Sequence, residues 1–85
     1  MKQPQITDFI NGPVTYDENG GGYFWVNSSN GIQMLGEIRG WGHIQHMFEN
    51  PKGKIDFESA AKFQDDLGKF IAEAINEKFE KLKTV

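Results

Sequence analysis

FESAAKFQDDLGKFIAEAINEKFEKL, residues 57–82, carries the clearest structural pattern in the chain. Apolar residues recur at three- and four-residue intervals, which is typical of an amphipathic helix. Asp56 directly precedes the run and is a suitable N-cap, while Lys78, Lys81 and Lys83 lie toward the opposite, negative end of the helix dipole. The pattern predicts a long C-terminal helix over about 57–82.

This predicted helix has more apolar surface than one neighbour covers. Its apolar positions sweep about 200° of arc, roughly twice the usual stripe. It is also about 39 Å long at 1.5 Å per residue, whereas a globule of this size is only about 30 Å across. We therefore expect one of two outcomes. Either the helix breaks near Gly68, or its last turns, with Phe79 and Leu82, extend beyond the domain and need a partner.

The N-terminal half is rich in glycine, β-branched and aromatic residues, and it contains three short apolar runs. The runs predict strands at about 13–17, 22–27 and 32–39. Asn19-Gly20 and Asn30-Gly31 separate them, and Asn-Gly is the strongest short-range signal of a β-hairpin. We therefore predict a three-stranded antiparallel meander.

The two Asn-Gly pairs also predict a register if each is the centre of a two-residue turn. Val14 then lies opposite Trp25, and Val26 lies opposite Leu35. One face, predicted to be the core, collects seven residues: Val14, Tyr16, Tyr23, Trp25, Ile32, Met34 and Ile38. The other face carries Thr15, Phe24, Val26, Gln33, Leu35 and Glu37. A longer loop through Ser28-Ser29 would slip the pairing by one residue and exchange the faces, so this alternative stays open.

Two further segments complete the predicted architecture. Apolar residues between Trp41 and Phe48 recur at helical spacing, which predicts a short helix over about 41–49 that ends before Asn50-Pro51. Residues 6–12 fit either a single helical turn or an extended segment. Residues 1–85 are thus expected to form one small α+β domain, with the long helix packed on one face of the sheet.

Composition restricts the classes of function. The 85 residues have a formal net charge of −3, no cysteine and no cluster of basic residues. A disulfide framework is excluded, and the acidic balance argues against nucleic acid as a partner. No apolar run is long enough to span a membrane, so we expect no membrane partner and a cytoplasmic location.

Three segments could carry chemistry. His43, His46 and Glu49 supply types of side chain that bind zinc, but one short helix directs only two of them to the same side. Residues 40–42, Gly-Trp-Gly, lie where a strand turns into a helix, without the third glycine of a dinucleotide-binding motif. Residues 17–22 resemble a calcium loop only superficially and read as a turn. We assign no catalytic residue, no cofactor and no metal.

The expected function is therefore a non-catalytic protein-interaction or accessory module. Self-association as a homodimer, through the long helix or through an open face or edge of the sheet, is its simplest form. The candidate interface residues are Phe24, Val26, Leu35, Phe79 and Leu82. A small metal-binding or hydrolytic enzyme centred on His43 and His46 is the alternative. A weak single-stranded nucleic-acid binder that uses Tyr23, Trp25 and Trp41 is a third hypothesis.

Overall fold

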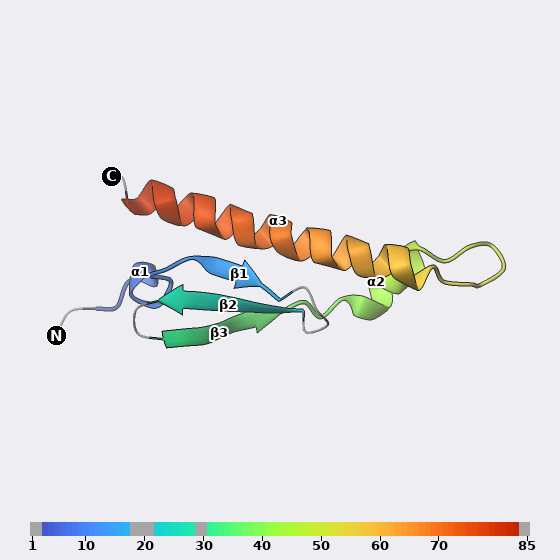
Figure 1. The fold of residues 1–85 in the computed structure, drawn as a ribbon, viewed down its shortest axis with the longest axis horizontal. Coiled ribbons are helices and arrows are strands. Elements are labelled where there is room, and N and C mark those ends of the chain that lie inside the picture. Colours follow the sequence, from blue (N-terminus) through green and yellow to red (C-terminus); the bar gives the residue numbers. More distant parts are fainter. Residues whose placement is uncertain (1–2, 18–21, 29–30, 84–85) are drawn as a thin grey trace.

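The computed structural model describes residues 3–17, 22–28 and 31–83, and it has the predicted α+β arrangement. A three-stranded antiparallel sheet is followed by a short helix and a long C-terminal helix (Figure 1). The elements are α1 (Ile6–Phe9), β1 (Val14–Tyr16), β2 (Tyr23–Ser28), β3 (Gly31–Glu37), α2 (Trp41–Met47) and α3 (Phe57–Lys83).

The strand order β1-β2-β3 confirms the meander, but the predicted register is wrong. Val14 pairs with Val26 rather than with Trp25, a slip of one residue in the first hairpin. In the second hairpin Val26 pairs with Gln33 rather than with Leu35, and the register shifts between Phe24 and Trp25. The predicted turn centre Asn19-Gly20 and Asn30 of the second pair lie outside the described residues.

The slip between β1 and β2 changes which side chains of β2 face the core. Val14 of β1 is buried as predicted, whereas Phe24 and Val26 of β2, predicted for the other face, are buried with it and with Ala72 of α3. The chemistry of the side chains explains which residues of β2 are buried. Phe and Val have no polar atom, whereas Tyr23 and Trp25 carry an O–H and an N–H that need a partner or water. Trp25 is partly exposed on the opposite face.

α3 continues through Gly68 without a break, so the alternative in which the helix breaks at that residue is wrong. A methyl group at Gly68 would overlap the ring of Tyr16, so glycine lets the helix approach β1 closely. The start of the helix is capped as predicted. The Ser59 N–H donates to Asp56 Oδ1 (3.1 Å) and the Ser59 hydroxyl donates to Oδ2 (2.7 Å).

α2 packs against the first turns of α3, beyond the end of the sheet (Figure 1). Ile44 of α2 and Ala60 of α3 are buried there, and the rings of Phe48 and Phe63 lie 5.7 Å apart. Trp41, the first residue of α2, is among the exposed large apolar residues. This second contact makes the molecule elongated, with extents of 59 × 24 × 20 Å.

The ambiguous segment near the N-terminus contains one helical turn, α1. This turn is stabilised by the Gln5 N–H, which donates to Asp8 Oδ2 (2.8 Å). α1 lies beside the C-terminal turns of α3 (Figure 1). The end of the long helix therefore has a neighbour within the same chain.

Candidate functional site

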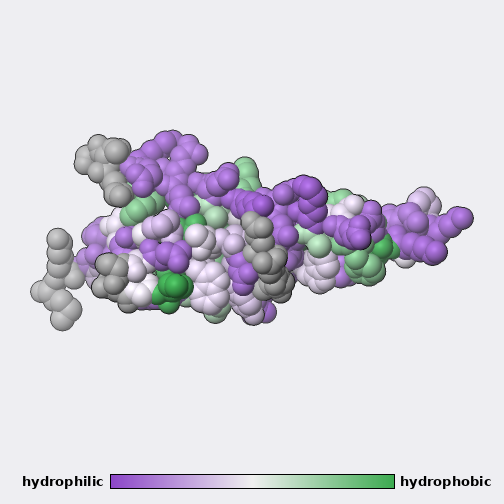
Figure 2. All heavy atoms as spheres, in the orientation of Figure 1, coloured by the Kyte–Doolittle hydropathy of each residue, from purple (hydrophilic) through white to green (hydrophobic). Residues whose placement is uncertain are grey.

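The face of the sheet that points away from α3 carries an apolar surface, which we call the open face. It consists of Tyr23, Trp25, Ile32 and Met34. Ile32 is 68% exposed and Met34 54% exposed, and the rings of Tyr23 and Trp25 lie 6.1 Å apart. In Figure 2, hydrophilic side chains line α3, whereas paler and more apolar side chains gather over the sheet. Large exposed apolar residues on one face are typical of a surface that binds a partner.

The outer edge of β3 borders this face. The Asn27 N–H donates to the Pro13 carbonyl and the Ile38 N–H donates to the Gly22 carbonyl, both at 2.9 Å. Because hydrogen-bonding directions alternate along a strand, the N–H and C=O of Ile32 and Met34 point away from β2. In the part of the chain that the structure describes, no further strand pairs with this edge.

The opposite edge of the sheet, along β1, is closed by a side chain. The Val14 N–H donates to Asn76 Oδ1 (2.7 Å), and Asn76 Nδ2 donates to the Val14 carbonyl (2.8 Å). A carboxamide of α3 thus pairs with the strand much as a further strand would. Natural sheets also protect their edges with charged residues or proline. Residues 31–35, Gly-Ile-Gln-Met-Leu, contain neither. The protein protects one edge of its sheet and leaves the other open.

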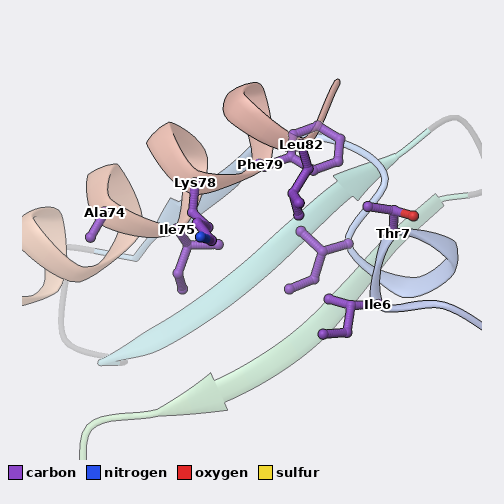
Figure 3. Close-up of a pocket in the computed structure, with 8 residues that line it drawn as sticks. Ile6, Thr7, Ala74, Ile75, Lys78, Phe79 and Leu82 are labelled. Carbon is purple, nitrogen blue, oxygen red and sulfur yellow. The ribbon is translucent and has the colours of Figure 1, made fainter. Parts of the chain in front are cut away.

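A second apolar surface is the groove between α1 and α3, which we call the α1–α3 groove. Its volume is about 260 Å³. Ile6 borders it from α1, while Ile75 and Leu82 border it from α3 (Figure 3). Ile6 is 74% exposed and Leu82 48% exposed. The remaining lining residues are Thr7, Ile10, Ala74, Lys78 and Phe79.

The five predicted interface residues lie in three different surroundings. Phe24 is 6% exposed and Val26 1% exposed, so both belong to the core and neither is available to a partner. Leu35 is half-buried against the same core. Phe79 is half-buried in the α1–α3 groove, and Leu82 is exposed at its rim. Only the helical members of the set therefore lie at a candidate surface.

The predicted histidine pair lies at the other end of the molecule. His43 and His46 are both exposed on α2, and His46 Nδ1 lies 2.9 Å from Glu49 Oε2. Within residues 3–17, 22–28 and 31–83, no three histidine, aspartate or glutamate side chains gather as a metal-binding cluster would require. The arrangement near His46 is a surface pair of side chains three residues apart.

Of the two other segments that could carry chemistry, the structure describes residues 40–42 in full and residues 17–22 only at their two ends. Gly40 precedes α2 with a φ of −114°, so this turn does not need the left-handed backbone that only glycine adopts easily. Most of the loop at residues 17–22 lies outside the described residues.

Sequence reasoning missed Ile6, Ile32 and Met34 as surface residues. Ile32 and Met34 were assigned to the core because the first hairpin was placed one residue out of register. The available signal was the contrast between Phe24 and Val26, which are wholly apolar, and Tyr23 and Trp25, which are not. Nothing local in the sequence indicates that Ile6 lies beside α3.

Comparisons with models of protein families, with curated proteins and with solved structures return no match. Among the helices that the structure describes, none combines the length and the apolar character needed to cross a bilayer.

Proposed function

We propose that the protein is a non-catalytic interaction module that self-associates through the open edge of β3 and the adjoining open face. The single observation that supports this most strongly is the contrast between the two edges of the sheet. Asn76 covers β1, whereas within the described residues no strand pairs with the outward backbone groups of Ile32 and Met34, whose apolar side chains are exposed. An edge that carries no charge over residues 31–35 is a template for another strand.

A second copy fits this edge by symmetry. If a twofold axis passes beside Gln33, Ile32 of each copy lies opposite Met34 of the other in antiparallel pairing. The outward backbone groups of these residues then form four hydrogen bonds across the interface, because each hydrogen-bonded pair exchanges two. The side chains of Ile32 and Met34 meet on the same face, so the open faces of the two copies become continuous.

The proposed dimer exchanges with monomer, because the strand that forms it is short. Residues 31–35 cover only about 17 Å of strand at 3.4 Å per residue. A stable specific pair buries about 800 Å² on each partner, so side chains of the open face have to contribute to the contact. A protein partner is favoured over nucleic acid because the chain has a net charge of −3 and no cluster of basic residues.

Sedimentation velocity of the full chain, over a range of concentrations, tests the proposal. We expect the wild type to dimerise and the Ile32→Lys variant to stay monomeric at the same concentrations, because a lysine at the interface opposes strand pairing. Ala61→Lys is the matched control, since it adds the same charge at an exposed position of α3. Circular dichroism checks that each variant keeps its fold.

Two outcomes would overturn the proposal. The first is a wild-type protein that remains monomeric at several hundred micromolar. The second is a dimer that Ile32→Lys does not weaken but that Leu82→Glu dissociates, because the contact would then lie on the helical surface instead of the β3 edge.

A further inference from the structure

The α1–α3 groove differs from the open face in shape and in chemistry. It is a hollow between two helices, and the side chains around it are aliphatic or aromatic except for Thr7 and Lys78. Figure 3 shows Ile6 on one side and Leu82 and Ile75 on the other, directed toward the same space. An apolar hollow with few polar groups is the usual form of a small-molecule site.

The volume of the groove limits what fits into it. At about 30 Å³ for each group the size of a water molecule, 260 Å³ holds about nine methyl or methylene groups. An α-helix from a second copy is about 10 Å wide with its side chains and does not enter such a space. A single extended hydrocarbon chain does.

The charge at the rim indicates the head group of this ligand. Among the described residues that line the groove, Lys78 is the only charged one. Within the described residues no carboxylate forms an ion pair with it, whereas Lys81, one turn further on, lies 3.6 Å from Glu77.

We propose that the α1–α3 groove binds a free medium-chain fatty acid of about eight to ten carbons, with its carboxylate beside the Lys78 ammonium group. The hydrocarbon chain of the ligand covers the exposed sides of Ile6 and Leu82. Removal of this apolar area from water drives binding. The Thr7 hydroxyl is the other polar side chain at the groove. This site is separate from the β3 edge and does not depend on self-association.

Isothermal titration of the full-length protein with hexanoate, octanoate, decanoate and dodecanoate tests which length of hydrocarbon chain the groove accepts. Each fatty acid is used below its micelle concentration. We expect each added methylene to strengthen binding by about two- to fourfold until the groove is filled near ten carbons, and little gain thereafter. Ala74→Leu, which places a larger side chain in the groove, weakens decanoate binding without a change in the sedimentation behaviour of the protein.

The head group is tested with Lys78→Gln. This variant lowers affinity for decanoate by about threefold, the scale of an exposed ion pair, and leaves affinity for decanol unchanged. Lys81→Gln is the matched control and leaves both affinities unchanged. Amide chemical shifts on addition of decanoate should move at Ile6 and Leu82.

Four results would overturn the assignment. The first is the absence of decanoate binding at millimolar concentration. The second is an affinity that does not depend on the length of the hydrocarbon chain. The third is a set of amide shifts confined to β3. The fourth is binding to phosphatidylglycerol vesicles without binding of decanoate, which would indicate a lipid surface as the ligand. Failure of this site leaves the sedimentation test of self-association unaffected.

Discussion

Asn76 has a larger structural role than a polar residue on a helix usually has. Its carboxamide donates one hydrogen bond to the backbone of Val14 and accepts another from it. Buried or half-buried backbone groups must be paired, and here the partner comes from a residue 62 positions away in the chain. One side chain thus attaches α3 to the edge of the sheet and prevents that edge from pairing elsewhere.

We expect Asn76→Leu to lower the free energy of unfolding by about 2 kcal/mol, because the Val14 N–H and C=O lose their partner while remaining partly buried. Urea denaturation followed by circular dichroism measures the change. Glu73→Leu, at an exposed position one turn earlier, is the control and should stay within about 0.5 kcal/mol of the wild type. An Asn76→Leu variant as stable as this control would contradict the role assigned to the carboxamide.

At the scale of the elements, the close approach of α3 to β1 depends on Gly68. Glycine inside a helix usually lowers stability, so an alanine there should normally be favourable by about 1 kcal/mol. The ring of Tyr16 occupies the space that an alanine methyl group would need. That ring is itself packed against Phe24, with centroids 5.2 Å apart, so it has little room to move.

We therefore expect Gly68→Ala to destabilise the protein by about 1–2 kcal/mol, the usual cost of overpacking, despite the gain in helix propensity. In a Tyr16→Val background the same substitution should become stabilising, because the overlap is gone. A double-mutant cycle measured by thermal and urea denaturation isolates this coupling. A stabilising effect of Gly68→Ala in the wild-type background would show that the two elements are not in close contact.

The elements differ in how far the sequence predicted them. The long helix, the short helix and the three strands have the predicted type and order, because each depends on a local pattern of apolar residues. The pairing of the strands does not depend on a local pattern, and its predicted register was wrong. A shift of one residue between β1 and β2 moved Trp25 out of the core and Val26 into it.

At the scale of the whole molecule, two aspartates couple stability to pH. The Ser59 hydroxyl donates to Asp56 and holds the pKa of that carboxyl below its ordinary value. Lys62 donates to Asp66 at 2.7 Å and lowers the pKa of Asp66 in the same way. Both side chains are exposed, so the effect on the free energy of unfolding is small.

Because these pKa values are lower in the folded state, the aspartates stabilise the protein above their unfolded pKa of about 3.9. That contribution is lost as the pH falls through the folded values. We expect the free energy of unfolding to decrease more steeply below about pH 4 in the wild type than in an Asp56→Asn/Asp66→Asn variant. Urea titrations at several pH values measure both. Asp65→Asn removes a neighbouring carboxylate as a control, and equal slopes in wild type and double variant would contradict the prediction.

The elongated shape also belongs to this scale. A helix of 27 residues is about 40 Å long, more than the sheet alone can cover. α2 packs on its first turns and α1 borders its last turns, so three neighbours share the wide apolar arc. Apolar area remains exposed all the same, at the open face and along the rim of the α1–α3 groove.

Local periodicity in the amino-acid sequence was enough to establish α2, α3, the strands, their order and the α+β class, because these features depend on residues only a few positions apart. The core face of the sheet, the closure of the β1 edge by Asn76 and the groove beside Ile6 depended on contacts between distant segments. Both registers of the first hairpin satisfy the same alternating pattern. The choice between them became definite only when α3 packed on the sheet and buried the side chains that have no polar atoms.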